Sequence, residues 1–211
     1  MIIVITAIVS LVAFNNQQLM DKLIFYPPAV SEHQQYYRFI SCGFIHADIP
    51  HLLFNMFSFF VFSEALVEPK FNEYFGTYGK FAFLAMYLLA MIVCLLPTYF
   101  KNKHNEYYRS LGASGAVSAV IFAGLLISPL SLIGLFIIPP IIPGFIFGPI
   151  YLLLSYYLDK RQSDNVNHSA HIWGALFGVV FIIVSTKLFS TVDIWGDFVE
   201  SVQFYFKSKF G

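Results

Sequence analysis

Long apolar segments alternate with shorter polar ones along the chain. We expect helices that cross a membrane over six of them: Met1 to Phe14, Pro50 to Val67, Lys80 to Leu96, Ser114 to Ile127, Gly144 to Leu158 and Ser169 to Phe189. Such a helix needs about 20 mostly apolar residues, because lipid cannot satisfy its backbone polar groups. The first, fourth and fifth segments are short, so we expect tilting, extension by flanking residues or shelter inside the bundle. The fourth, rich in Gly, Ala and Ser, is expected at the centre.

The segments between these helices differ in character. Asn15 to Ile49 is long and rich in aromatic residues, and we expect it to have structure of its own. Ser128 to Pro143 is apolar but carries four prolines, which forbid a continuous helix, so a loop or re-entrant segment is expected there. After residue 189, apolar residues recur at helical spacing among charged ones, which indicates an amphipathic helix at the membrane surface. The chain therefore divides into a membrane domain, residues 1–189, and a tail, residues 190–211.

The composition supports a lipid environment. Hydrophobic residues make up 58% of the 211 residues and charged ones 11%, with a mean hydropathy of +0.70. This leaves too little polar surface for a soluble domain, and the fold class expected is an all-α polytopic membrane helix bundle. Twelve basic and twelve acidic residues balance, so we expect no nucleic-acid partner. The first segment lacks the basic start and the cleavage site of a signal peptide and is expected to be retained as a span.

A serine among small residues opens the fourth segment, in the run Gly112-Ala113-Ser114-Gly115. Free N–H groups and the positive end of the helix dipole stabilise negative charge at such a helix start, and glycines let another chain approach closely. Ser114 is therefore a candidate nucleophile. The alternative is a packing helix whose small residues serve only close contact between membrane helices.

His171 lies at the start of the sixth segment. Gly174 and Gly178 follow it at i+3 and i+7, so the three residues share one helical face. A face this smooth can pack against the small residues of the fourth segment, which would bring His171 to Ser114. A neutral imidazole can accept the hydroxyl proton of a serine, so His171 is a candidate general base. A histidine that only hydrogen-bonds a neighbouring helix is the alternative.

Two further polar residues, His51 and Asn55, lie at i and i+4 near the start of the second segment. Because polar side chains are costly in lipid, they should face the bundle interior. There they could donate hydrogen bonds to the oxyanion of a tetrahedral intermediate, and hydrogen bonding between helices without catalysis is the alternative. His46 lies in the preceding loop and is expected to order it through hydrogen bonds.

Residue spacing does not favour metal or aspartyl chemistry. The sequence contains no His-Glu-x-x-His run, which a zinc protease would show, and its acidic residues fall in loops, at segment ends or in the tail. We expect neither a metal site nor a cofactor.

Three patterns together resemble the rhomboid family of intramembrane serine proteases: HLLFN from His51 to Asn55, GASG from Gly112 to Gly115, and AHIWGALFG from Ala170 to Gly178. The pair Tyr37-Arg38 looks like the Trp-Arg pair of that family's long first loop. The resemblance implies a six-span bundle with Ser114 as nucleophile and His171 as general base. The oxyanion donors that it implies are His51, Asn55 and the backbone N–H of Ser114. The supporting residues are Gly112, Gly115, Gly174, Gly178, His46 and Arg38.

The resemblance also implies a substrate class and a location. The substrates are membrane proteins cleaved in or near transmembrane segments, and the location is a bacterial inner membrane. The first loop and the active-site opening lie on the extracytoplasmic side, although the distribution of Lys and Arg alone mildly favours the opposite orientation. Many bacterial relatives carry an aromatic residue one turn after the nucleophile, under the histidine. Here that position is Ser118, so we expect Phe122 or Tyr108 to orient His171 instead.

Two readings from other functional classes stay open. A noncatalytic rhomboid-like protein that binds membrane helices is the main alternative. A small transporter lined by histidine and asparagine is a more remote one. The sequence leaves the oligomeric state open.

Overall fold

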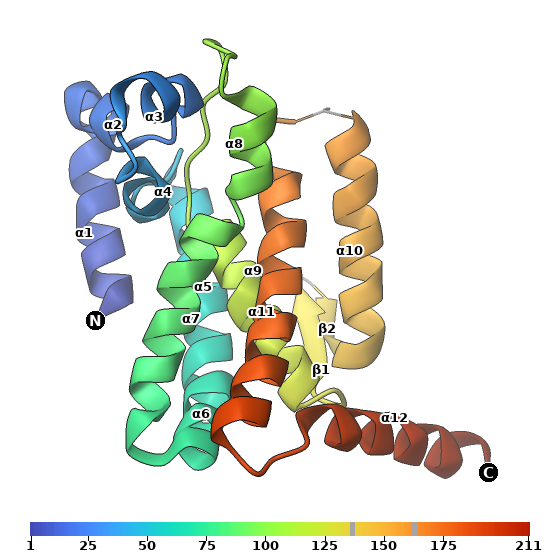
Figure 1. The fold of residues 1–211 in the computed structure, drawn as a ribbon. Helices are drawn as coiled ribbons and strands as arrows, with labels where there is room; N and C mark the ends of the chain where they lie inside the picture. The colour runs from blue at the N-terminus through green and yellow to red at the C-terminus, as the bar shows by residue number, and fades with distance from the viewer. Residues whose placement is uncertain (136–137, 162–163) are drawn as a thin grey trace.

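The computed structural model describes residues 1–135, 138–161 and 164–211, and most of these described residues are helical. The long helices are α1 (Ile2–Phe14), α5 (Ile49–Phe62), α7 (Gly79–Val93), α9 (Ser114–Ile127), α10 (Gly144–Arg161) and α11 (His168–Phe189). They lie side by side in one bundle (Figure 1). Their positions confirm the helices predicted from the apolar segments.

The presence of these helices does not by itself give the number of membrane spans. A helical stretch from Ile49 to Asn102 and the helix His168–Phe189 are long and apolar enough to cross a membrane, and Ile2–Phe14 and Ser114–Ile127 are shorter apolar helices. The first stretch joins α5 to a π-helical turn (Ser63–Val67), α6 (Glu68–Phe75), a 3₁₀ turn (Gly76–Tyr78), α7 and α8 (Leu96–Asn102). The count of six spans therefore stays a prediction.

Helix α9 forms the centre of the bundle. It contacts α5, α7, α10 and α11, and most of its residues are buried on every side. Small side chains along α9 let these neighbours approach closely, because membrane helices associate through close packing and not through expulsion of water. The prediction that the fourth segment is central is confirmed.

The long connection after α1 has structure of its own, as predicted. It contains α2 (Gln17–Leu23), α3 (Pro27–His33), α4 (Arg38–Ser41) and a 3₁₀ turn (Cys42–Phe44), and it lies at the upper end of the bundle in Figure 1. Two side-chain caps mark its boundaries with helices. Asn16 Oδ1 accepts from the Leu19 N–H at 3.0 Å, and Asp48 Oδ1 accepts from the His51 N–H at 2.7 Å. Such caps satisfy the free donors of a first turn and set where each helix begins.

The all-α expectation is wrong for the apolar, proline-rich segment before α10, which contains two strands. Strand β1 (Leu132–Leu135) pairs antiparallel with β2 (Ile138–Pro143), with Ile133 opposite Ile142, where a loop or re-entrant segment was expected. Part of that expectation, residues 136–137, lies outside the described residues. A two-stranded ribbon has two free edges, so prolines without N–H donors can be accommodated there, whereas a helix would lose hydrogen bonds.

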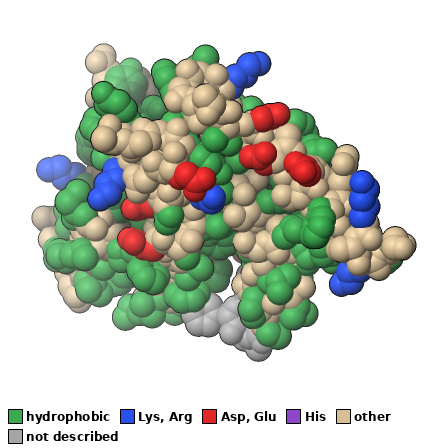
Figure 2. All heavy atoms as spheres, turned by 90° about the horizontal axis from the view of Figure 1, so that it is seen from below, with side chains coloured by type: hydrophobic (Ala, Val, Ile, Leu, Met, Phe, Trp, Pro, Cys, Tyr) green, Lys and Arg blue, Asp and Glu red, His purple; other side chains and the backbone are tan. Residues whose placement is uncertain are grey.

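Helix α12 (Ile194–Phe210) confirms the helix predicted in the tail. It begins at Asp193, whose Oδ1 accepts from the Gly196 N–H at 3.1 Å, and it runs across the lower end of the bundle (Figure 1). The rings of Tyr205 and Phe206 contact the Phe145 ring of α10 at 5.2 and 5.9 Å. Figure 2 shows acidic and basic side chains among apolar ones on this end of the molecule. Contact of α12 with a membrane surface stays a prediction.

Candidate active site

The long connection between α1 and α5, called the first loop below, holds the backbone that leads into Ser114. Phe25 and Ser110 exchange two backbone hydrogen bonds, of 2.9 and 3.1 Å, and the Gly112 N–H donates to the Cys42 carbonyl at 2.9 Å. Gly112 has a φ of +107°, a backbone conformation that residues with a β-carbon rarely adopt. These contacts turn the chain so that α9 starts at Ser114, with its free backbone N–H groups at the same end.

Helices α9 and α11 meet backbone to backbone directly beneath this turn. A β-carbon built on Gly174 would collide with the carbonyl of Gly115, and one on Gly178 with the carbonyl of Ala119. The predicted contact between the glycine face of α11 and the small residues of α9 is therefore present. It fixes the distance between the first turns of the two helices.

Asn167 ties the start of α11 to two other elements. Its Oδ1 accepts from the Ala170 N–H at 3.1 Å, which caps the helix, and from the Thr98 hydroxyl of α8 at 3.2 Å. Its Nδ2 donates to the Ser110 hydroxyl at 3.3 Å. The first turn of α11 is thus anchored to the segment that precedes Ser114.

Ser114 and His171 lie within hydrogen-bonding distance of each other. Ser114 Oγ is 2.7 Å from His171 Nε2, and both side chains are partly accessible. A neutral imidazole protonated on Nδ1 accepts the hydroxyl hydrogen through Nε2. This is the arrangement in which a histidine can withdraw the proton of a serine as the oxygen attacks a carbonyl.

His51 lies beside the turn at Gly112, whereas Asn55 is engaged in its own helix. A β-carbon on Gly112 would lie 2.9 Å from His51 Nε2, so the missing side chain makes room for the ring. The Ala47 N–H approaches His51 Nδ1 at 3.5 Å, which favours a ring that carries its proton on Nε2. Asn55 Nδ2 donates to the His51 carbonyl at 3.0 Å. The structure therefore brings His51 towards the start of α9 and leaves Asn55 turned along α5.

His46 connects the first loop to α1 and to the start of α9. Its Nδ1 lies 3.0 Å from Ser10 Oγ, which donates to the Phe44 carbonyl at 3.0 Å. Its Nε2 accepts from the Ala113 N–H at 3.5 Å. Burial, aided by the nearby charge of His51, lowers the pKa of His46 to about 3. The ring is therefore neutral, and it links the loop to α1 and to the start of α9.

Arg38 holds the folded loop together. Its Nη1 donates to the carbonyls of Asp21 and Ile24 at 2.9 and 2.6 Å, and its Nε donates to Gln35 Oε1 at 2.6 Å. Carbonyls at the end of a helix lack partners within it, so a guanidinium there satisfies groups that would otherwise be buried without a bond. Arg38 acts on the loop and lies apart from the serine.

Two residues that contact the His171 ring were not predicted from the sequence as its ring neighbours. The ring of Tyr151, on α10, stacks against it with centroids 6.5 Å apart, and the ring of His168 meets it edge-on at 5.7 Å. His168 Nε2 also hydrogen-bonds Asp164 at 3.1 Å, which lowers the pKa of that carboxyl. Phe122, one of the two residues expected to orient His171, packs against Tyr151 instead. His168 could have been found from its position one turn before His171, whereas no local spacing points to Tyr151.

Tyr108, the other expected residue, lies in a different environment. Burial raises its pKa, and hydrogen bonds to Ser110 and Thr98 act in the opposite direction. Its hydroxyl thus belongs with the polar groups around Asn167.

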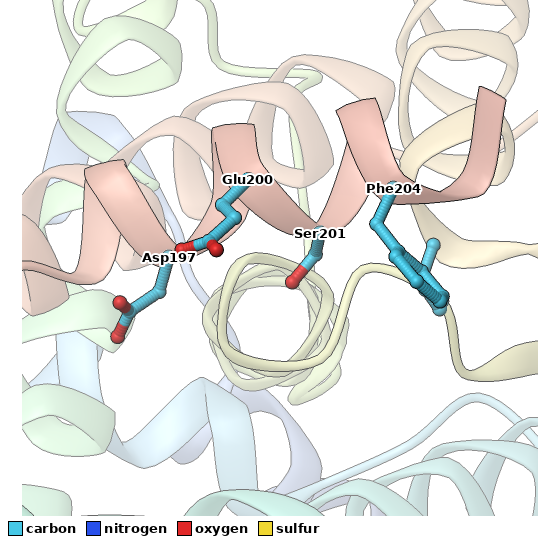
Figure 3. A pocket seen from close by; sticks show the side chains of 5 residues that line it. Asp197, Glu200, Ser201 and Phe204 are labelled. Carbon is cyan, nitrogen blue, oxygen red and sulfur yellow. The ribbon is translucent and has the colours of Figure 1, made fainter. Parts of the chain in front are cut away.

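A cavity near α12 is separate from this cluster. It has a volume of about 380 Å³ and is lined by Leu130 and by the four α12 residues labelled in Figure 3. Leu130 follows the C-terminal end of α9, about 20 Å from the start of that helix at 1.5 Å per residue. Within the described ranges, no group of three His, Cys, Asp or Glu residues is arranged to hold a metal ion.

Comparison with known proteins gives one consistent family. A family model described as Rhomboid domain matches residues 33–187. The chain is 31% identical over 147 residues to Presenilin-associated rhomboid-like protein A, mitochondrial, of Danio rerio, covering 66% of this chain and 35% of that protein. It is 26% identical over 166 residues to Rhomboid-like protein 11, chloroplastic, of Arabidopsis thaliana, covering 72% of this chain and 53% of that protein. The chain thus spans about half or less of the length of these relatives.

Proposed function

The chain belongs to the rhomboid family, and on that premise we propose that it is an intramembrane serine endopeptidase. The observation that carries the proposal is the 2.7 Å separation of Ser114 Oγ and His171 Nε2. A serine alone is a weak nucleophile at neutral pH, and a histidine at this distance is the group that activates it. Packing of α11 on α9 would not by itself require these two polar atoms to face each other.

The reaction begins with proton transfer from Ser114 to His171. The serine oxygen attacks the carbonyl carbon of the scissile peptide, and the carbonyl oxygen takes the negative charge. The His51 Nε2–H and the Ser114 backbone N–H stabilise that oxyanion, and the Asn55 amide joins them after rotating away from the His51 carbonyl. His171 then gives its proton to the leaving amine, which leaves an acyl ester on Ser114.

Water completes the cycle. His171 takes a proton from a water molecule while its oxygen attacks the ester. As the bond to the serine oxygen breaks, His171 returns that proton to the serine, and the new carboxylic acid leaves and loses its proton to water. Both substrate and water have to reach the first turns of α9 and α11. A substrate helix has to unwind locally, because its peptide bonds are otherwise occupied in the hydrogen bonds of the helix.

The proposed partners are membrane proteins and the lipid bilayer. We assign residues 1–189 to a six-span membrane domain and residues 190–211 to a tail that lies at the membrane surface. The first loop, and with it the opening of the site, faces the extracytoplasmic side. The names of the relatives refer to mitochondria and chloroplasts. The bacterial inner membrane is a proposal that rests on the motif resemblance alone, and fractionation of the native cells tests it.

Purified protein in detergent tests the activity. Wild type, Ser114→Ala and His171→Ala are each incubated with a fluorophosphonate probe and with a model single-span membrane protein. We expect labelling and cleavage by wild type only. Ser208→Ala, which removes an exposed hydroxyl of α12, is the matched control and should behave as wild type. Equal labelling of wild type and Ser114→Ala would end the proposal.

The noncatalytic alternative predicts a different result in the same experiment. A rhomboid-like protein that only binds membrane helices would retain the model substrate in a pull-down, without cleavage and without labelling. The 2.7 Å contact favours the enzyme, because binding alone has no need of an activated serine.

A further inference from the structure

We propose that Tyr151 is a positioning residue that holds the imidazole of His171 in the plane required for proton transfer. The Tyr151 ring lies nearly parallel to the His171 ring, at an interplanar angle of 24° and a centroid distance of 6.5 Å. It comes from α10, whereas Ser114 comes from α9 and His171 from α11. This inference rests on the proposed protease function and adds a residue to it.

Ser118 fixes the other end of the tyrosine. The Tyr151 hydroxyl and Ser118 Oγ are 3.1 Å apart, and Ser118 is buried one turn after Ser114. A larger side chain at position 118 would fill the space that the tyrosine occupies between α9 and α11. The aromatic ring expected from α9 is thus replaced by a ring from α10 whose hydroxyl reaches the vacated position.

Two phenylalanines restrict the remaining freedom of the tyrosine. Phe122 of α9 contacts the Tyr151 ring at 5.5 Å, and Phe147, one turn earlier on α10, contacts it at 5.9 Å. With the hydroxyl bonded and the ring packed against two others, Tyr151 has little room to change rotamer. It therefore presents a fixed aromatic surface to His171.

The histidine needs such a surface because its ring torsion is broad. The terminal torsion of a histidine has no narrow staggered minima, so neighbours decide which way the ring nitrogens point. The His171 ring lies nearly parallel to the Tyr151 ring, with centroids 6.5 Å apart, and meets the His168 ring edge-on. Together the two rings confine the imidazole to orientations in which Nε2 points to Ser114.

Substitutions at Tyr151 separate positioning from folding. Tyr151→Ala and Tyr151→Leu should lower kcat and the rate of fluorophosphonate labelling by about 10- to 100-fold, the range that misplacing a reacting group costs. The KM for a membrane substrate should change by less than about three-fold, because a positioning residue acts on His171 and not on the substrate. Tyr151→Phe keeps the aromatic surface and should stay within about three-fold of wild type in both quantities.

Two controls make the result specific. Tyr157→Ala removes a half-exposed tyrosine of the same helix and should leave labelling unchanged. The double variant Ser118→Tyr with Tyr151→Ala moves the ring to α9 and should recover at least about a third of the wild-type labelling rate. Thermal unfolding in detergent shows whether each variant is folded, and Tyr151→Leu retains much of the volume if the alanine variant is not.

The outcomes distinguish the two proposals. If wild type is labelled and folded Tyr151→Leu is labelled at the same rate, the positioning role is refuted while the protease function stands. A rise in KM with unchanged kcat refutes it as well, because the residue would then contribute to substrate binding. If wild type itself is not labelled, the protease function fails and the role of Tyr151 fails with it.

Discussion

Gly174→Ala is the sharpest test of the contact between α9 and α11. The added β-carbon would collide with the carbonyl oxygen of Gly115 and would lie 2.8 Å from its carbonyl carbon, whereas ordinary contacts of a β-carbon are at least 3.4 Å long. The two helices would have to separate by at least about 0.6 Å, since backbone cannot rotate out of the way as a side chain can. A shift of at least that size along the line between the two atoms would lengthen the 2.7 Å separation of Ser114 Oγ and His171 Nε2 to about 3.3 Å or more. This is beyond the reach of about 3.2 Å that proton transfer needs.

We therefore expect Gly174→Ala to reduce fluorophosphonate labelling of Ser114 by about 100-fold, the cost of an ångström-scale misplacement. Overpacking should also lower the free energy of unfolding by about 1 to 3 kcal/mol, measured by unfolding in detergent. Val180→Ala, on an exposed face of α11, is the matched control and should label as wild type. A folded Gly174→Ala protein that labels at the wild-type rate would show that the close contact does not set the geometry of the pair.

Three further predictions concern residues around the pair. The ordinary pKa of histidine is 6.5 and burial lowers that of His46 to about 3, so its contribution to stability is complete above pH 6.5 and is lost as the pH falls towards 3. The loss is about 1.4 kcal/mol per pH unit over that window, and His46→Gln should flatten the pH dependence of thermal unfolding. Asn167→Ala removes the cap of α11 and should cost about 1 kcal/mol of stability and slow labelling, whereas Asn165→Ala, at an exposed position of the preceding loop, should do neither; equal labelling rates would contradict this. Gly112→Ala should cost about 1 to 2 kcal/mol through its positive φ, and it should slow labelling by displacing His51, with unchanged labelling as the contrary result.

Much of the fold could be predicted from local patterns in the sequence. Helix bounds could be predicted because an apolar run must satisfy its own backbone hydrogen bonds in lipid, whatever surrounds it. The α9 helix begins and ends where its apolar run does. The contact with α11 was also foreseeable, because the spacing of Gly174 and Gly178 places both on one side of the helix. The pairing of β1 with β2 was not, because it depends on a partner segment and not on one run of residues.

The residues of the candidate site also differ in whether local sequence patterns could predict them. Ser114 and His171 stand out in the sequence because small residues and a helix start surround each of them within a few positions. Tyr151, which lies against His171, has no such signal: it is on another helix, and its contact depends on how α10 is rotated towards α9. The same holds for Ser10, whose hydroxyl meets His46 only because α1 packs beside the first loop.

The sequence by itself determined the six long apolar helices of this rhomboid-family chain and which two residues form the candidate pair, because both follow from the chemistry of neighbouring positions. Only the tertiary structure decided which ring supports the histidine and which groups keep His46 neutral. Those contacts join residues from separate helices, and their rotation and spacing are set by the packing of the whole bundle.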